Sequence, residues 1–128
     1  MNINIRKANP KDFPSILSLN KEFSIFQKTP EKVSITLEQM KNDANLFQCF
    51  VAENDAHEII GFASFYFAYY SWVGKGLYLD DLYVKENYRK HKIGSRLLNM
   101  VIDFAKKEKC KKLRWLVSKW NTEAIEFY

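Results

Sequence analysis

Apolar and polar residues alternate with a period of two in several parts of the chain, which predicts β-strands. Ile3 and Ile5 indicate a short first strand. Four later runs predict further strands, and the "DAHE" turn makes the first two of them a hairpin. These runs are "FQCFVAEN", "IIGFASFYFAYY", "LYLDDLYV" and "KLRWLVS", at residues 47–54, 59–70, 77–84 and 112–118.

Four segments favour helices instead. Asn9 followed by Pro10 can cap and start the first, which runs past Phe13 and Phe23. A short helix is predicted over residues 36–43, and Asn121 can cap a last one in "TEAIEFY". The longest is predicted from an apolar stripe of Ile93, Leu97, Leu98, Val101, Ile102 and Ala105.

The order of these elements is β-α-α-β-β-β-α-β-α. Strands joined by hairpins come first, and a single βαβ unit follows them. This order predicts an α+β fold with a mixed, mostly antiparallel sheet flanked by helices.

Composition bounds the class of protein. The 128 residues fit one domain, and 47% of them are hydrophobic, enough for one core. No apolar run approaches the roughly 18–20 residues of a membrane span, and the first ten residues lack the apolar stretch of a secretory signal. We therefore expect a cytoplasmic protein. Two cysteines and two histidines, scattered along the chain, give no metal-ligand spacing, so no metal is expected and the thiols are predicted to be buried.

The net charge of +5 is unevenly spread. Residues 1–64 carry 7 bases and 8 acids, whereas residues 65–128 carry 13 bases and 7 acids. A basic second half suits a polyanionic ligand, either a nucleic acid or a cofactor with several phosphates.

The stretch "NYRKHKIGSRLLN", residues 87–99, joins a strand to the longest helix. The first turn of a helix has N–H groups without intrahelical partners, and together with the helix dipole they favour an anion. Arg89, Lys90 and Lys92 add charge, Gly94 allows close approach to the backbone, and Ser95 adds a hydroxyl. The bases could simply be solvated at a turn, but they oppose the dipole unless an anion is bound.

The residues "YRKHKIGSRLL" resemble the acetyl-CoA-binding motif of the GCN5-related N-acetyltransferases (GNAT), R/Q-x-x-G-x-G/A. Arg89 fills the first position, Lys92 the first glycine and Gly94 the last. The flanking "IIGFASFYFAYYSWVGKGLYLDDLYV" and "LRWLVSKWNTEAIEFY" resemble the spermidine/spermine and thialysine N-acetyltransferase branch. The resemblance implies a GNAT-like fold and acetyl-CoA as co-substrate, bound by Arg89, Lys90, His91, Lys92, Ile93, Gly94 and Ser95.

Lys92 departs from the family pattern, which usually has glycine there. If the backbone φ at this position is negative, lysine is harmless and adds a cation. If φ is positive, lysine costs about 1 kcal/mol. In both cases we expect the loop to keep its shape and the cofactor to bind.

Asp80 and Asp81 interrupt an apolar strand, and a period of two predicts that they face opposite sides. Acetyl transfer to an amine needs a proton acceptor, because a free amine with a pKa of about 10.4 is protonated at neutral pH. The resemblance implies that Asp80 draws the proton off through water and that Asp81 binds the substrate. The alternative is a pair of surface carboxylates at a strand edge.

The resemblance also implies roles for the backbone. The N–H groups of Leu82, Tyr83 and Val84 match those that hold the acetyl oxygen and pantetheine arm. Asn121 and Thr122 match positions near the pantetheine, although Asn121 is equally a plain helix cap. Tyr128 matches the tyrosine thought to protonate the CoA sulfur. Family members continue beyond it with one or two strands, so we expect a single domain, 1–128, that lacks them.

The residues expected to bind the amine substrate match the family pattern least closely. Trp72 is retained from the family, and Tyr70 stands where an acid is frequent, so either ring could hold an ammonium by a cation–π contact. Glu22 and Glu31 are the acidic candidates of the first half. The expected substrate is a polyamine-like or amino-acid-like primary amine. The 16% aromatic content and the resemblance also predict a homodimer.

Two other functions compete with this one. The first is an acetyl-CoA-binding protein with weakened catalysis, which the change at Lys92 would allow. The second is a basic nucleic-acid-binding module, favoured by "AKKEKCKKLRW", although this run lacks the interleaved aromatics of RNA-binding sheets and suits a solvated helix end. We expect an enzyme with no nucleic acid or membrane partner.

Overall fold

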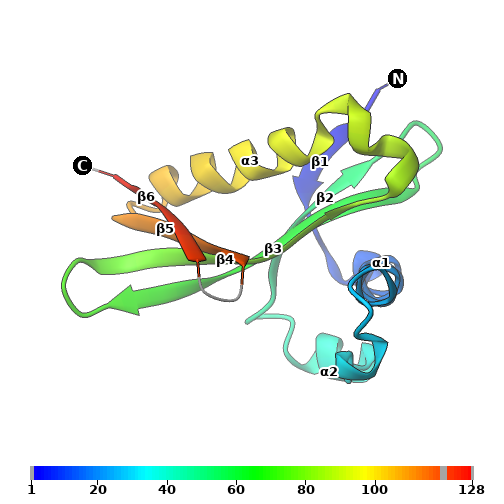
Figure 1. The fold of residues 1–128 in the computed structure, drawn as a ribbon, viewed down its shortest axis with the longest axis horizontal. Helices are drawn as coiled ribbons and strands as arrows, with labels where there is room; N and C mark the ends of the chain where they lie inside the picture. The colour runs from blue at the N-terminus through cyan, green and yellow to red at the C-terminus, as the bar shows by residue number, and fades with distance from the viewer. Residues whose placement is uncertain (1, 119–120, 128) are drawn as a thin grey trace.

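The computed structural model describes residues 2–118 and 121–127, with the backbone alone at residues 116–118 and 121–126. Figure 1 shows one sheet with helices on both of its faces. The strands are β1 (Asn4–Lys7), β2 (Gln48–Glu53), β3 (Ile59–Tyr70), β4 (Gly74–Val84), β5 (Lys112–Ser118) and β6 (Asn121–Glu126). The helices are α1 (Phe13–Phe26), α2 (Leu37–Asn42) and α3 (Ile93–Lys107), with short 3-10 turns η1 (Pro10–Asp12), η2 (Pro30–Lys32) and η3 (Glu86–His91).

The sheet follows the chain, with its strands in the order β1-β2-β3-β4-β5-β6. Neighbouring strands are antiparallel except β4 and β5, which are parallel and are joined through α3. This is the predicted α+β fold with a mostly antiparallel sheet, and the prediction is confirmed.

Each face of the sheet carries its own core. On one face α3 buries Ile93, Leu97, Val101 and Ala105 against β2, β3, β4 and β5 (Figure 1). These four positions belong to the predicted apolar stripe. On the other face α1 and α2 pack Phe13, Ile16, Leu19 and Met40 against Cys49, Val51, Phe62 and Tyr83. The two cysteines, Cys49 and Cys110, are free and buried, as predicted.

Capping residues fix where the first two helical segments begin. The Asn9 side chain accepts from the N–H of Lys11, and Asp12 accepts from the N–H of Asn9. Thr36 and Gln39 form the same reciprocal pair at the start of α2. Arg6 of β1 also donates two hydrogen bonds to Asp12, which ties α1 to the edge of the sheet.

The last element differs from its prediction, because residues 121–126 form strand β6 and not a helix. The final order is therefore β-α-α-β-β-β-α-β-β. β6 pairs antiparallel with β5 from Lys112↔Glu126 to Ser118↔Asn121. The six-residue segment is too short for a stable helix of its own. As a strand, its backbone pairs with the edge of β5 that would otherwise be open. The predicted helix cap at Asn121 is wrong for the same reason.

Among the helices of the described residues, none has the length and apolar content required to cross a membrane.

Candidate active site

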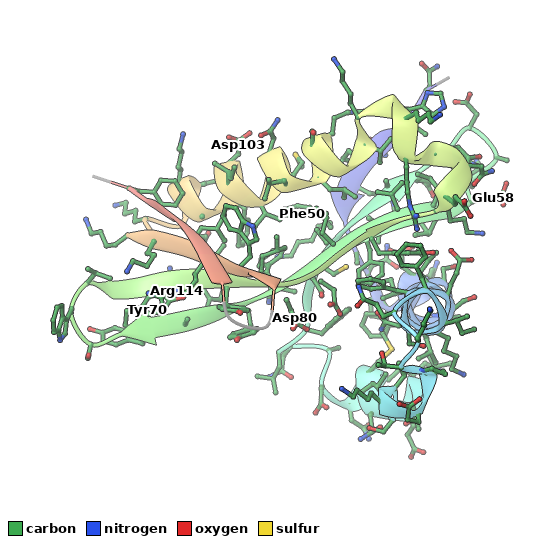
Figure 2. The ribbon with its side chains drawn as sticks, in the orientation of Figure 1. Phe50, Glu58, Tyr70, Asp80, Asp103 and Arg114 are labelled. Atoms are coloured by element: carbon green, nitrogen blue, oxygen red, sulfur yellow. The ribbon has the colours of Figure 1, made fainter. Side chains whose placement is uncertain are left out.

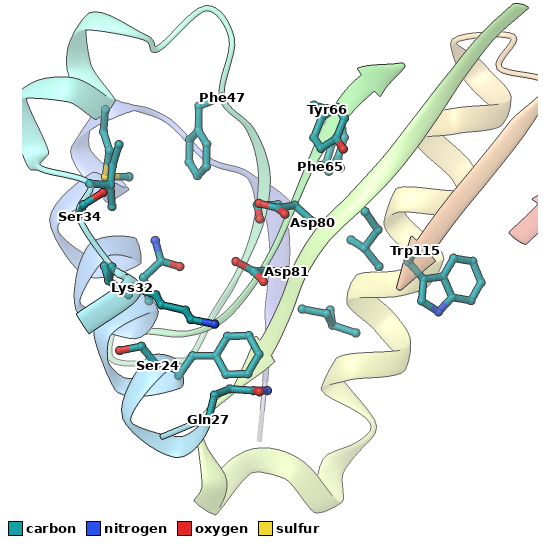
Figure 3. Close-up of a pocket in the computed structure, with 18 of the residues that line it drawn as sticks. Ser24, Gln27, Lys32, Ser34, Phe47, Phe65, Tyr66, Asp80, Asp81 and Trp115 are labelled. Carbon is teal, nitrogen blue, oxygen red and sulfur yellow. The ribbon is translucent and has the colours of Figure 1, made fainter. Parts of the chain in front are cut away.

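Asp80 and Asp81 both line one cleft, although they are consecutive residues of a strand. Opposite them, β3 pairs Ser64 with Asp81 and Phe65 with Leu79, so Asp80 has no partner and forms a β-bulge. Figure 3 shows both carboxylates turned toward the same space. A bulge adds one residue to a strand and shifts its alternation. The prediction that the two side chains face opposite sides was therefore wrong.

The residues around the bulge show the shift directly. Before it, Leu77 and Leu79 pack in the core beneath α3, and after it Leu82 and Val84 do so. Apolar positions thus change from odd to even numbers across Asp80. The bulge keeps both halves of β4 buried on the α3 face and directs two acids to the opposite face.

The cleft has a volume of about 1320 Å³ and lies between the sheet and the segment joining α1 to α2. Its sheet side is formed by β3, β4 and Trp115 of β5 (Figure 3). The opposite wall comes from α1, η2 and α2, and includes Asn20, Phe23, Ser24, Gln27, Thr29, Lys32, Val33, Ser34, Ile35 and Met40. A space of this size can admit a small extended substrate.

The protein environment raises the pKa of both acids. Removal of water by the surrounding protein raises the pKa of Asp80, although much of the residue surface stays exposed. The pKa of Asp81 rises to about 6, first through burial and second through the neighbouring Asp80 charge. Asp81 therefore titrates closer to neutral pH than an ordinary aspartate, and its titration depends on the charge of Asp80.

The sheet opens beyond this pair. Strands β4 and β5 pair only from Gly76↔Lys112 to Leu79↔Trp115, although β4 continues to Val84 and β5 to Ser118. Leu82, Leu98 and Trp115 line the cleft at this divergence. The backbone of Leu82, Tyr83 and Val84 pairs with β3 on one edge and has no β5 partner on the other. This open edge can hydrogen-bond an extended ligand arm.

The turn after β4 leads to the start of α3. η3 covers Glu86–His91, and Lys92 then has φ 60° and ψ 22°, in the left-handed region. No side chain caps α3 at Lys92, and the first backbone bond of the helix joins the N–H of Arg96 to the Lys92 carbonyl. The N–H groups of Ile93, Gly94 and Ser95 therefore have no partner inside the helix. The backbone φ of Lys92 is positive, which is the strained of the two alternatives predicted for this position.

Neither the backbone conformation nor the packing of the described residues requires glycine at position 94. Its φ is not positive, because among the described glycines only Gly74 has a positive φ. Within 4.0 Å, a Cβ atom at Gly94 would meet Val84 Cγ2 alone among the described residues outside its own helical turn. Glycine at this position leaves room for a molecule outside the chain to approach the backbone.

Arg89 points back to the protein. Its Nε donates to the Val84 carbonyl at 2.8 Å, and its guanidinium lies 4.8 Å from the Phe26 ring centre and 5.3 Å from that of Tyr83. The side chain joins η3 to the end of β4 and to α1. Lys90, His91, Lys92 and Ser95 are exposed around it, and the side chain of Ile93 is buried in the core.

Glu22 has a structural partner. The hydroxyl of Tyr83 donates to Glu22 at 2.6 Å, and burial followed by this bond raises the Tyr83 pKa to about 12. The Tyr83 ring also stacks on Phe23, with 4.9 Å between ring centres. Neither Glu22 nor Glu31 lines the cleft, so these two predicted acidic candidates lie outside it.

The two predicted aromatic residues lie away from the acids. Tyr70 pairs with Gly74 near the hairpin tip, about 20 Å along β3 from the residue opposite Asp81. It packs over Arg114, with 5.0 Å between the guanidinium and the ring centre (Figure 2). Trp72 is 97% exposed at the tip. Within this chain neither residue lines the cleft.

The remaining predicted residues are at the end of the chain. Asn121 and Thr122 lie in β6, with only their backbone described. Tyr128 lies outside the described residues. In the described part of the chain, no group of three or more His, Cys, Asp or Glu residues could hold a metal ion.

The family model for the acetyltransferase (GNAT) family matches residues 13–128. The chain belongs to the GNAT family. Its bulge, its open β4 edge and the uncapped start of α3 are thus features of an acetyltransferase, and the predicted family is confirmed.

Relatives support the predicted branch of the GNAT family. Thialysine N-epsilon-acetyltransferase of Bos taurus is 33% identical over 135 residues, which cover 97% of this chain and 79% of that protein. Spermidine/spermine N(1)-acetyltransferase-like protein 1 of Homo sapiens is 35% identical over 134 residues, which cover 97% of this chain and 19% of that protein. The chain is therefore an enzyme of the N-acetyltransferase class.

Solved GNAT structures share the fold. A predicted acetyltransferase with acetyl-CoA from Clostridium acetobutylicum superposes with a TM-score of 0.75. It is 23% identical, and the match covers 92% of this chain and 82% of that chain. This likeness supports the fold alone.

Sequence reasoning did not find the wall of the cleft that faces the acids. Ser24, Gln27 and Lys32 belong to a segment without repeated spacing or a motif. The pairing of Ser64 with Asp81 was missed as well, because a bulge leaves no clear signal in an apolar strand. The two adjacent acids in that strand were the one available sign.

Proposed function

We propose that this GNAT enzyme transfers the acetyl group of acetyl-CoA to a primary amine by direct attack of the amine on the thioester. The observation that carries the proposal is the shared orientation of Asp80 and Asp81 beside the open edge of β4. The edge leads to the uncapped start of α3, so amine-binding and phosphate-binding groups lie along one path.

Acetyl-CoA would be held by two parts of this path. The N–H groups at the start of α3 and the exposed bases Lys90 and Lys92 favour its phosphates. The space outside Gly94 allows close approach of the pyrophosphate, and His91, Ile93 and Ser95 contribute the surrounding backbone. The open-edged backbone of Leu82, Tyr83 and Val84 would bind the pantetheine arm, and Asn121 and Thr122 of β6 are proposed as further contacts of that arm. When bound, acetyl-CoA supplies the activated thioester.

The acids would prepare the amine. A substrate ammonium is attracted to the two carboxylates, and Asp80 accepts its proton through water while Asp81 holds the amine. With a pKa of about 6, Asp81 is mostly ionised at neutral pH. Tyr128 is proposed as the donor that protonates the CoA thiolate.

Acetyl transfer to a panel of amines tests this function. Release of free CoA should depend on both acetyl-CoA and an amine, and mass spectrometry should find the acetylated amine. The panel contains polyamines, thialysine, lysine and aminoglycosides. Binding of acetyl-CoA without turnover on any amine would instead indicate a binding protein with weakened catalysis.

We also propose a homodimer in the cytoplasm. The β3–β4 hairpin exposes Tyr66, Phe67, Tyr69, Trp72 and Val73, which are 42% to 97% exposed. Burial of such a surface by a second copy would be favourable. Sedimentation at tens of micromolar should give the mass of a dimer, and a monomer at that concentration would reject the assembly.

A further inference from the structure

One basic side chain lines the cleft that holds the acids. Among the described cleft residues, the charged ones are Lys32, Asp43, Asp80 and Asp81. Figure 3 shows the Lys32 ammonium extended from the α1–α2 segment into the cleft, in the direction of Asp81. The cleft therefore has an anionic side on β4, whereas the facing wall carries one cationic group, Lys32, together with the carboxylate of Asp43 at the end of α2.

The backbone at Lys32 is held in place. Its N–H donates to the Thr29 carbonyl at 3.0 Å, and the N–H of Thr29 donates to the Ser24 carbonyl of α1 at 2.8 Å. Pro30 restricts the turn further by fixing its own φ. The ammonium consequently enters the cleft from a fixed point on the wall.

Lys32 is not used to neutralise the acids. In the described part of the chain no carboxylate lies within ion-pair distance of its ammonium, and the four ion pairs found there involve other residues. An ammonium directed into a substrate cleft without an internal partner is available to an anionic group of the ligand. The same ammonium repels any ligand whose far end is also cationic.

We propose that Lys32 binds a carboxylate of the substrate, so that this enzyme prefers an amine with an anionic end, such as an amino acid with a side-chain amine, over a polyamine. The inference rests on the proposed acetyl transfer to an amine at Asp80 and Asp81. The reacting ammonium is drawn to the acids, and the carboxylate is drawn to the facing wall. A polyamine would instead place a second cation beside Lys32.

Lysine and cadaverine form a matched pair of probes, because cadaverine is lysine without its carboxylate. We expect the wild-type enzyme to acetylate lysine at its side-chain amine with the higher kcat/KM. Lys32→Gln should reduce the ratio of kcat/KM for lysine over cadaverine by about tenfold, the size of one charge-assisted hydrogen bond. Lys32→Glu should reduce it further and should lower the KM for cadaverine.

Lys28→Gln is the matched control. It removes the same charge from the same segment, and Lys28 is exposed as Lys32 is, but it lies outside the cleft lining. This variant should keep the wild-type ratio. An unchanged ratio in Lys32→Gln, or an equal change in Lys28→Gln, would overturn the role of Lys32, as would acetylation of the lysine α-amine next to the carboxylate.

Equilibrium binding separates this inference from the proposed function. With acetyl-CoA absent, calorimetric titration should show that lysine binds more tightly than cadaverine, and that Lys32→Gln removes the difference. If neither probe is acetylated but this binding preference is present, the proposed reaction fails and the role of Lys32 stands. If both are acetylated but Lys32→Gln leaves their ratio and binding unchanged, the role of Lys32 fails and the reaction stands.

Discussion

Asp80 and Asp81 are adjacent in the chain and face the same cleft, because a β-bulge opposite Ser64 and Phe65 inserts Asp80 as an extra residue in β4. The bulge gives the site two carboxylates at one place on a rigid strand. Burial and the neighbouring Asp80 charge raise the pKa of Asp81 to about 6, so this carboxyl can take up and release a proton near neutral pH.

Replacement of Asp80 tests its proposed role as proton acceptor. Asp80→Asn keeps the size of the side chain and removes the acceptor, so turnover at neutral pH should fall by about 10²-fold or more. Residual activity should rise as pH approaches the pKa of the amine, about 10.4, where the free amine no longer needs a base. The measurement is a pH–rate profile, and a profile parallel to that of the wild type would remove Asp80 from this role.

Asp81 should cost stability at neutral pH. Its folded pKa, about 6, lies above the value of an unfolded aspartate, about 3.9, so the folded chain binds this proton more tightly. The free energy of unfolding contributed by Asp81 therefore falls as pH rises from about 4 to about 6 and stays low above that. Asp81→Asn should unfold at higher denaturant concentration than the wild type at about pH 7.5, with a difference that shrinks toward pH 4.

Asp103→Asn is the control for this comparison, because Asp103 is an exposed acid on α3 (Figure 2). Asp103→Asn should not show the pH-dependent gain in the free energy of unfolding that is expected of Asp81→Asn. An Asp81→Asn chain that is less stable than the wild type at neutral pH would show that the carboxylate stabilises the fold.

Lys92 should tolerate glycine. Its positive φ costs about 1 kcal/mol for a residue with a Cβ atom, and glycine removes that strain while it adds freedom to the unfolded chain. Lys92→Gly should therefore leave the free energy of unfolding unchanged or raise it by up to about 1 kcal/mol. Lys90→Gly, in η3 and without a positive φ, should lose about 0.5–1 kcal/mol. Equal losses in the two variants by chemical denaturation would reject the strain at Lys92.

Arg89 should stabilise the loop before any ligand binds. Arg89→Lys keeps the charge but loses the planar donor to the Val84 carbonyl and the stacking on Phe26. The free energy of unfolding without acetyl-CoA should fall by about 1 kcal/mol, and acetyl-CoA affinity should fall with it. A loss of affinity with no loss of stability would mean that the guanidinium contacts the phosphates and does not hold the loop.

Much of the fold could be predicted because its elements are long and regular in pattern. The alternation in residues 59–70 and the stripe from Ile93 to Ala105 gave β3 and the buried face of α3 almost to the residue. Asn9 and Thr36 mark helical starts through side-chain bonds that depend only on nearby residues. Residues 121–126 were predicted as a helix because the cap signal is local, whereas their pairing depends on the distant edge of β5.

Part of the site could also be predicted from local sequence. Asp80 and Asp81 are charged residues in an apolar strand, and the 89–95 turn carries several bases at a helix start. The orientation of the acids could not be predicted, because the bulge depends on the register with β3. Lys32 reaches the cleft only through the path of the α1–α2 segment, and Arg89 turns toward Val84 because α1 supplies Phe26 beside it.

The position of Gly94 separates ligand binding from folding most clearly. Gly94→Glu adds a side chain where the described part of the chain offers only Val84 Cγ2 within 4.0 Å of the new Cβ atom, so the fold should accept it. Glutamate is favoured over glycine inside a helix and in its first turn, so the free energy of unfolding should not fall. Its carboxylate would occupy the space proposed for the pyrophosphate and repel it.

Calorimetric titration of Gly94→Glu with acetyl-CoA therefore tests most directly whether acetyl-CoA is bound along the β4 edge with its phosphates at the start of α3. Asp80→Asn is titrated beside it and should bind acetyl-CoA as the wild type does while acetyl transfer is lost. We expect the Kd of Gly94→Glu to rise by about tenfold or more, the effect of about 1.4 kcal/mol. A stably folded Gly94→Glu chain that binds acetyl-CoA with the wild-type Kd would place the phosphates elsewhere.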